Sequence, residues 1–189
     1  MDFTAHDVLP SVKLIIPKRH ADERGFLSET WREEEVREAG APVHFVQENH
    51  CLTHAVGTIR GLHFQVGDAA QCKLVRCIRG SILDVVVDIR RGSPNFGCHA
   101  VQVLSEENWC QLYIPIGFAH GYCTLRPNTE VLYKVSSYYD PKAERGLAWN
   151  DPELKIEWPV TSESAIMTAR DRNFPMLAEL PEFFPYTGE

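Results

Sequence analysis

Two of the eight histidines have neighbours that suit a reactive imidazole. His63 follows Arg60-Gly61-Leu62, and His120 lies in Gly117-Phe118-Ala119-His120-Gly121. A glycine lets the backbone approach a ligand closely, and an imidazole changes its charge near neutral pH. Because a buried histidine is often only a hydrogen-bonded core residue, these contexts indicate acid–base candidates and leave a structural role open.

Other common chemistries lack the spacing that they need. A metal site usually needs three or four ligands, often with two histidines close together, but the sequence has no His-x-His and residue 65 is Gln65. It also has no Gly-x-Ser-x-Gly nucleophile motif and no P-loop or dinucleotide-binding glycine motif. The six cysteines have no CxxC spacing, which indicates core residues rather than disulfides or zinc ligands. General acid–base chemistry by His, Tyr and carboxylates is favoured, and a metal-dependent enzyme is the weaker alternative.

Strands are the elements most able to position these groups. Short β-rich runs, several of them separated by Gly or Pro, follow one another in this order: 43–49, 58–66, 73–78, 82–89, 100–104, 111–116, 121–125 and 130–139. Many short strands with little helix indicate an antiparallel sandwich or barrel. One helix is predicted at residues 30–40, with Thr30 as its cap, acidic first turns and Gly40 as its end.

Alternation along the strands predicts which side chains share a face. In residues 82–89 the odd positions are all apolar, and Asp84 lies on the opposite face. Tyr133 shares its parity with Val131 and Val135, so we expect its side chain to point inward.

The same alternation creates a conflict around the first histidine. Strict pleating would send Arg60 and His63 to opposite faces of one strand. Both can line one pocket only if Gly61 interrupts the pleat, as a glycine at a bulge does.

Composition narrows the classes of protein. A length of 189 residues fits one domain with a sizeable core. The net charge of −7 argues against a nucleic-acid partner but leaves room for a small anionic ligand. No stretch approaches the roughly 20 apolar residues of a membrane span, and the first residues lack a signal-peptide pattern. We therefore expect a cytoplasmic protein with no membrane partner.

A series of motifs along the chain matches a known family. In chain order they are Asp22-Glu23-Arg24-Gly25-Phe26 with Glu29, Gln47-Glu48-Asn49-His50, Ile59 to Gln65, Lys73-Leu74-Val75-Arg76, Asp88-Ile89-Arg90 with Ser93-Pro94, Ile114-Pro115 through His120-Gly121, Tyr133-Lys134, Trp149-Asn150-Asp151-Pro152 and Ile156-Glu157-Trp158-Pro159. Over residues 9–180 the pattern resembles the dTDP-4-dehydrorhamnose 3,5-epimerase family. The resemblance implies an all-β, cupin-type jelly roll with a few short helices. It also implies a single domain over residues 1–189 with short N-terminal and C-terminal arms, a homodimer, and no metal or organic cofactor.

The resemblance also implies a role for individual residues. His63 would be the base that removes protons next to the sugar ketone, oriented by Asp171. Tyr133 would deliver a proton to the opposite face, and Lys73, with Arg60, would stabilise the enolate oxygen at C4. The residues that would bind the substrate are Arg24, Glu29, Gln47, Asn49, Arg60, Lys73, His120, Glu144 and Arg170, with Tyr139 stacked on the thymine ring.

The reaction implied is epimerisation at C3 and C5 of dTDP-4-dehydro-6-deoxy-D-glucose to dTDP-4-dehydro-L-rhamnose, in dTDP-L-rhamnose biosynthesis. One alternative is an epimerase that acts on a single carbon or on another nucleotide-linked 4-keto sugar. An alternative of another class is a non-catalytic sugar-binding jelly roll. The chain departs from the family pattern at Arg170, where lysine is frequent, and at residues 51–57, where a more polar, serine-bearing stretch is expected.

Overall fold

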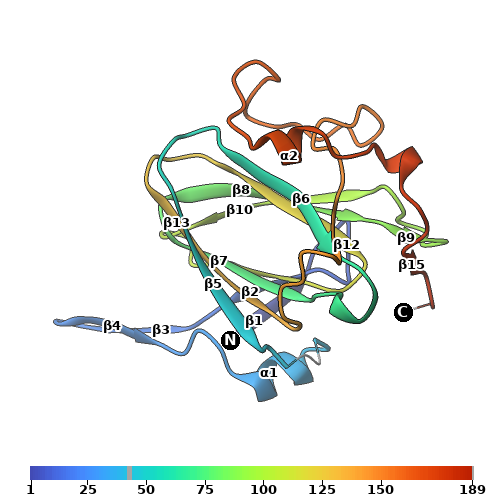
Figure 1. Cartoon of the computed structure of the whole chain (residues 1–189). Helices are drawn as coiled ribbons and strands as arrows, with labels where there is room; N and C mark the ends of the chain where they lie inside the picture. Colours follow the sequence, from blue (N-terminus) through green and yellow to red (C-terminus); the bar gives the residue numbers. More distant parts are fainter. Residues whose placement is uncertain (42–43, 189) are drawn as a thin grey trace.

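Two antiparallel sheets face one another around a barrel-like interior in the computed structural model, which describes residues 1–41 and 44–188 (Figure 1). The six-stranded sheet has the spatial order β1 (Asp2–Ala5), β2 (Lys13–Ile16), β11 (Gln111–Ile114), β7 (Lys73–Arg79), β13 (Thr129–Val135) and β5 (Gln47–Thr53). The five-stranded sheet has the order β10 (His99–Ser105), β8 (Ser81–Asp88), β12 (Phe118–Thr124), β6 (Ile59–Gln65) and β14 (Glu144–Gly146). The expected antiparallel sandwich with few short helices is confirmed.

The predicted strands agree with the observed ones from β6 onward, with shifted ends. The run at 130–139 stops at Val135, and the run at 121–125 begins earlier, at Phe118. The run at 43–49 becomes β5, which begins at Gln47 and continues to Thr53, whereas Val43 lies outside the described residues. Four short N-terminal strands, β1 to β4, were not predicted.

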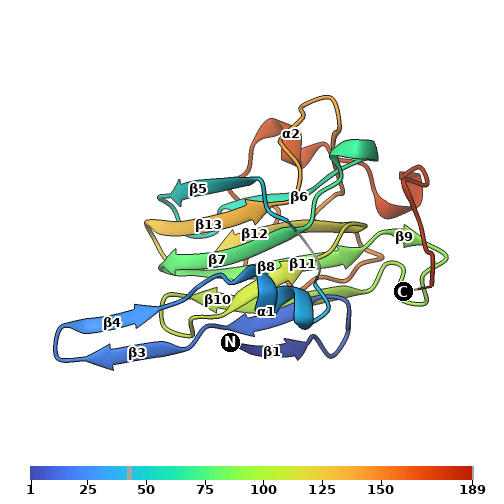
Figure 2. The same ribbon diagram turned by 90° about the horizontal axis from the view of Figure 1, so that it is seen from below.

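Strands β3 (Arg19–Asp22) and β4 (Gly25–Ser28) form a hairpin that projects away from the two sheets (Figures 1 and 2). At its base, Phe26 packs edge-on against Trp109, with ring centroids 5.0 Å apart. The side chains of Phe26 and Leu27 nevertheless remain 55% and 76% exposed. The hairpin therefore presents apolar surface that the rest of this chain leaves open to contact.

The predicted helix at 30–40 is shorter in the structure, where α1 spans Glu33–Glu38. Arg32 occupies the N-cap without a side-chain cap, so the prediction that Thr30 caps the helix is wrong. The Thr30 carbonyl instead accepts a hydrogen bond from the Gln111 side chain (2.8 Å), which ties this segment to β11. Gly40 follows the helix with a φ of +79°, the conformation that ends a helix.

The chain after β14 crosses the outer face of the five-stranded sheet. It carries α2 (Ala169–Arg172), which lies over β6 (Figure 1), and ends in β15 (Phe184–Pro185), paired with β9 (Arg90–Arg91). Leu177 and Leu180 of this segment pack on Val85 and Val87, whereas the other face of β8 contributes to the core between the sheets. Because both faces of β8 are buried, Asp84 lies between the two sheets rather than in solvent. None of the helices in the described ranges is long and apolar enough to span a membrane.

Candidate active site

A bulge in β6 positions the side chains on both sides of it. His63 is opposite His120, but Arg60 is opposite Tyr122, so β6 has one residue more than β12 over this interval. Gly61 has a φ of +135°, and a Cβ atom there would lie 2.5 Å from the Gly121 Cα. Only glycine fits this approach. Because the pleat is broken, both Arg60 and His63 line one cavity, which confirms that condition.

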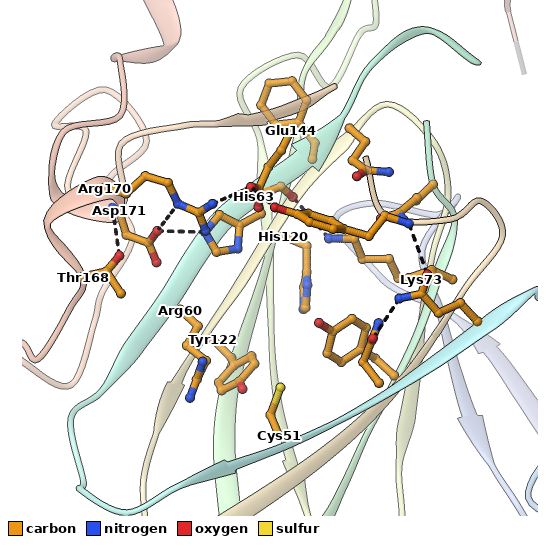
Figure 3. A pocket seen from close by; sticks show the side chains of 18 residues that line it. Cys51, Arg60, His63, Lys73, His120, Tyr122, Glu144, Thr168, Arg170 and Asp171 are labelled. Atoms are coloured by element: carbon orange, nitrogen blue, oxygen red, sulfur yellow. Dashed lines mark hydrogen bonds and ion pairs between the residues drawn. The ribbon is translucent and has the colours of Figure 1, made fainter. Parts of the chain in front are cut away.

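That cavity has a volume of about 410 Å³ and opens between the two sheets (Figure 3). His63 enters it from β6 of the five-stranded sheet, whereas Lys73 and Tyr133 enter it from β7 and β13 of the six-stranded sheet. The inward orientation predicted for Tyr133 from its parity is confirmed. An imidazole and a phenol on opposite walls can reach opposite faces of a flat ligand between them.

Asp171 fixes the orientation of the His63 ring. The His63 Nε2 atom lies 3.0 Å from Asp171 Oδ1, and the backbone N–H of Gly61 donates to Asp171 Oδ2 at 3.3 Å. Thr168 caps α2 by accepting a hydrogen bond from the Asp171 N–H (3.2 Å), which places the carboxylate. Since a carboxylate accepts, we assign the ring proton to Nε2, which leaves Nδ1 as the basic nitrogen.

The Asp171 carboxyl stays ionised although it is buried. Desolvation raises the pKa of this carboxyl, but the hydrogen bonds from His63, the Gly61 N–H and Thr168 together outweigh it, so the net pKa is lowered. At neutral pH the carboxylate is ionised, and it therefore stabilises the imidazolium that forms when His63 takes up a proton.

Lys73 is a buried cation on the opposite wall. Its Nζ donates to the His63 carbonyl oxygen (3.4 Å). Burial lowers the pKa of Lys73 to about 8, against the attraction of Asp84 and Glu144. The side chain is still mostly protonated at neutral pH, so it can donate a hydrogen bond to an oxyanion in the cavity.

Tyr133 keeps its proton at neutral pH. Burial is the main cause that raises the pKa of its phenol to about 12, while the charge of Arg60 opposes the shift. The Arg60 Nε donates to Thr53 Oγ1 (3.1 Å), which holds the guanidinium near the cavity wall. A protonated phenol in the cavity can donate a proton to a carbanion that forms there.

His120 pairs with a carboxylate that the sequence pattern did not single out. His120 Nε2 lies 3.0 and 2.9 Å from the two Asp84 oxygens, and both residues are buried. Burial is the main cause that lowers the pKa of His120, so its imidazole is neutral at neutral pH. Asp84 was missed because alternation along a strand predicts which residues share a face, but it does not predict which face borders a cavity.

Polar residues expected to bind a nucleotide form the rim of the cavity. Tyr139 is 52% exposed, and its hydroxyl donates to Glu144 Oε2 (2.8 Å), to which Arg170 also pairs. The Gln47 side chain accepts from the Tyr139 N–H (3.1 Å) and donates to Asn49 Oδ1 (2.9 Å). This network holds the Tyr139 side chain while leaving a ring face accessible for stacking.

Arg24 and Glu29 are the two expected site residues that do not line this cavity. Arg24 lies at the tip of the β3–β4 hairpin and pairs with Asp22 at 2.6 Å. Glu29 follows the hairpin and lies 3.9 Å from Arg32. The predicted role of these two residues in substrate binding therefore stays a prediction, and within this chain they lie apart from the other expected site residues.

Some cavity residues were not predicted, including Cys51, Tyr122 and Thr168. A signal for two of them was present in the strand period: Cys51 follows Asn49 by two residues, and Tyr122 follows His120 by two. Within the described ranges, no three His, Cys, Asp or Glu side chains are grouped as metal ligands.

Comparisons with known proteins agree on one family. The sequence profile of the dTDP-4-dehydrorhamnose 3,5-epimerase family matches residues 7–179. The dTDP-4-dehydrorhamnose 3,5-epimerase of Sinorhizobium fredii is 46% identical over 94% of this chain and 91% of its own length.

Solved structures give the same answer. The Bacillus anthracis dTDP-4-dehydrorhamnose 3,5-epimerase with TDP and PPi bound has a TM-score of 0.88 and 42% identity, covering 93% of this chain and 98% of that one. The Legionella pneumophila dTDP-6-deoxy-D-glucose-3,5-epimerase in complex with dTDP-4-keto-L-rhamnose has a TM-score of 0.92 and 35% identity, covering 98% of both chains.

Proposed function

The chain belongs to the dTDP-4-dehydrorhamnose 3,5-epimerase family, and from this premise we propose how its own residues carry out the reaction. It is a cupin-type isomerase of dTDP-rhamnose biosynthesis, which inverts C3 and C5 of dTDP-4-dehydro-6-deoxy-D-glucose. The observation that carries our assignment of roles is the placement of His63 and Tyr133 on opposite walls of one cavity.

His63 is the base. Its Nδ1 removes a proton from the carbon next to the C4 ketone, and Asp171, bonded to Nε2, stabilises the resulting imidazolium. The electron pair of the broken C–H bond moves onto the C4 oxygen and gives an enolate. Lys73 supplies the cation beside which that negative charge develops, with Arg60 as a second cation in the same cavity.

Tyr133 is the acid. Its protonated phenol donates to the same carbon from the opposite wall, the enolate collapses to the ketone, and the configuration at that carbon is inverted. Proton exchange with solvent then returns the imidazole and the phenol to their starting states. The sequence operates once at C3 and once at C5, since both carbons flank the ketone.

The cavity rim binds the nucleotide. We place the thymine ring on Tyr139 and the diphosphate near Arg170, with Gln47, Asn49, His120 and Glu144 as polar contacts. Support comes from their common position around the cavity and from the TDP and dTDP-sugar bound in the Bacillus anthracis and Legionella pneumophila structures. Binding energy from this remote part of the substrate positions the sugar for chemistry.

We also propose a homodimer in which the β3–β4 hairpin of one copy covers the cavity of the other. Arg24 and Glu29 then meet the substrate of the second copy, which accounts for their distance from the cavity of their own chain. The exposed Phe26 and Leu27 support this arrangement, because apolar surface of this kind marks a contact site.

Mixing two inactive variants tests the dimer. Chains with His63→Asn and chains with Arg24→Ala should each have low activity alone. After mixing and subunit exchange, a site with intact His63 and a partner's intact Arg24 forms, and activity should return to about a quarter of the wild-type value for random pairing. If the mixed variants stayed inactive, the proposal of a site shared between two chains would be contradicted.

We further propose one domain over residues 1–189 and a cytoplasmic location. The six cysteines are all free thiols in the structure, which supports a reducing compartment.

Incubation with dTDP-4-dehydro-6-deoxy-D-glucose in heavy water tests the function directly. We expect deuterium at both C3 and C5 of the product by NMR, with inverted configuration at both carbons. Label at one carbon only would identify a single-carbon epimerase, and tight binding without label would identify a sugar-binding protein.

A further inference from the structure

Arg170 connects the polar rim of the cavity to the partner of the base. Its Nε donates to Asp171 Oδ1 (3.4 Å), the same oxygen that lies 3.0 Å from His63 Nε2. Its Nη1 pairs with Glu144 Oε2, which also accepts from the Tyr139 hydroxyl (2.8 Å). One guanidinium therefore bridges two carboxylates, one at the rim and one beside the base (Figure 3).

The three side chains of this bridge differ in their exposure to a ligand. The Arg170 side chain is 54% exposed, whereas the side chains of Glu144 and Asp171 are 15% and 4% exposed. A nucleotide in the cavity can therefore contact the guanidinium and has little access to the Asp171 carboxylate. Because an arginine fork matches phosphate oxygens, a diphosphate can pair with Arg170 in place of the carboxylates.

Arg170 and His63 share the negative charge of Asp171. The carboxylate stabilises the imidazolium that forms when His63 takes up a proton, and a guanidinium on the same oxygen reduces that stabilisation. An anion that pairs with the guanidinium restores it. The effect is modest, since the contact is long and Arg170 is half exposed.

We infer that Arg170 couples binding of the substrate's diphosphate to the basicity of His63, through the Asp171 oxygen that both residues contact. In the free chain the guanidinium shares Asp171, and His63 is the weaker base. With the diphosphate bound, Arg170 pairs with phosphate and Asp171 serves the imidazole alone. Toward the base Arg170 is a positioning residue, because it acts through Asp171. This inference rests on the proposed function, in which the diphosphate lies near Arg170.

Arg170→Lys removes the proposed link and keeps the charge. Lysine has a methylene group where arginine has Nε, so the variant lacks the donor to Asp171 but still offers a cation to the diphosphate. The other titratable or charged groups that face His63 remain in place; they are Asp171 of α2, Glu144 of β14, His120 of β12, Lys73 of β7 and Tyr133 of β13.

Proton uptake on dTDP binding tests the coupling. Calorimetry in buffers of different ionisation enthalpy, between pH 5.5 and 7.5, measures the protons taken up, and subtraction of the His63→Asn value removes those bound by dTDP itself. We expect a difference of up to about a quarter of a proton in the wild type, the maximum for a threefold change in basicity. Measured against its own His63→Asn double variant, Arg170→Lys should show less than half of it. A larger share would mean that the phosphates act through space, and it would overturn the inference, as would no uptake in the wild type.

The pH profiles give a second readout that a structural role would not move. A stronger base holds its proton to a higher pH and cannot act until it loses it. Because kcat/KM reflects the free enzyme, we expect its fall from pH 7.5 to pH 5.5 to be about threefold larger in Arg170→Lys than in the wild type, the scale of one partly exposed ion pair. The kcat profile reflects the substrate complex and should be unchanged. Shifts in both profiles, or in neither, would overturn the inference.

Arg172→Lys is the matched control. Arg172 lies on the same helix, donates to the Ala165 carbonyl and does not line the cavity. We expect wild-type proton uptake and wild-type pH profiles in this variant. A wild-type chain that epimerises its substrate without the coupled proton would contradict the inference alone, whereas a chain that exchanges no proton of the sugar would contradict the proposed function.

Discussion

The two walls of the cavity prepare their reactive groups by different physical means. On the five-stranded wall, His63 is oriented by a hydrogen bond to Asp171, which is itself held by Gly61 and Thr168. On the six-stranded wall, Tyr133 depends chiefly on burial, which raises its pKa to about 12. A base needs the correct tautomer before substrate arrives, whereas an acid needs only to keep its proton. Directional bonds secure the first condition, and exclusion of water secures the second.

The largest effect should follow from removal of the base. We expect His63→Asn to slow deuterium incorporation at C3 and C5 by on the order of 10³-fold, within the range of general acid–base catalysis. Calorimetry should find the affinity for dTDP unchanged, because the nucleotide rim is intact. Near-normal exchange in this variant would move the base to another residue.

Removal of the acid, Tyr133, should separate proton removal from inversion, whereas removal of the base stops both. In Tyr133→Phe, His63 can still remove a proton and return one to the same face. We expect inversion to fall by about 10²-fold, while deuterium still enters with retained configuration, as NMR of the recovered sugar would reveal. Inversion at the normal rate would show that the phenol is not the donor.

Asp171→Asn should distinguish the two walls by stability. The variant loses charged hydrogen bonds at a buried position, so we expect about 1 to 3 kcal/mol less stability to urea and up to about 10²-fold less activity from a misoriented His63. Tyr133→Phe is the control and should unfold at the wild-type urea concentration. Similar losses of stability in both variants would contradict the contrast between the walls.

The effect of pH is the smallest of these near neutrality, because it grows only as the pH rises above 8. Lys73 has its pKa lowered to about 8, so it is protonated below that pH and loses its charge as the pH rises through it. We expect kcat/KM, which reflects groups of the free enzyme, to fall roughly tenfold for each unit above pH 8. In Lys73→Arg this decline should vanish up to pH 10, because arginine stays charged. A decline that persists in Lys73→Arg would assign it to another group.

Local patterns in the sequence predict part of this site. Two-residue periodicity is enough to predict that Tyr133 points inward. Because Arg60 and His63 would otherwise lie on opposite faces, the same periodicity predicts that the pleat is interrupted at Gly61. Both depend on neighbours within a few residues, where the strand geometry is regular.

Contacts between residues far apart in the sequence cannot be predicted from such local patterns. Asp171 reaches His63 across 108 positions because the C-terminal segment crosses the five-stranded sheet, and only the family resemblance suggested that contact. Asp84 was hidden because both faces of β8 are buried. The strands of the β3–β4 hairpin are four residues long and largely exposed, so no alternation marks them.

The contact of Gly61 with Gly121 couples the placement of Arg60 to the placement of His63, so that mutation cannot change one without the other. The same backbone kink directs Arg60 and His63, and any side chain at position 61 would push against the strand that carries His120. A descendant of this protein that acquires a new sugar preference through the backbone near Arg60 would therefore also displace its base. Divergence toward substrates with another nucleotide is more open at Tyr139 on the rim, whereas Arg170 also donates to Asp171 Oδ1 at 3.4 Å and is thereby tied to the base.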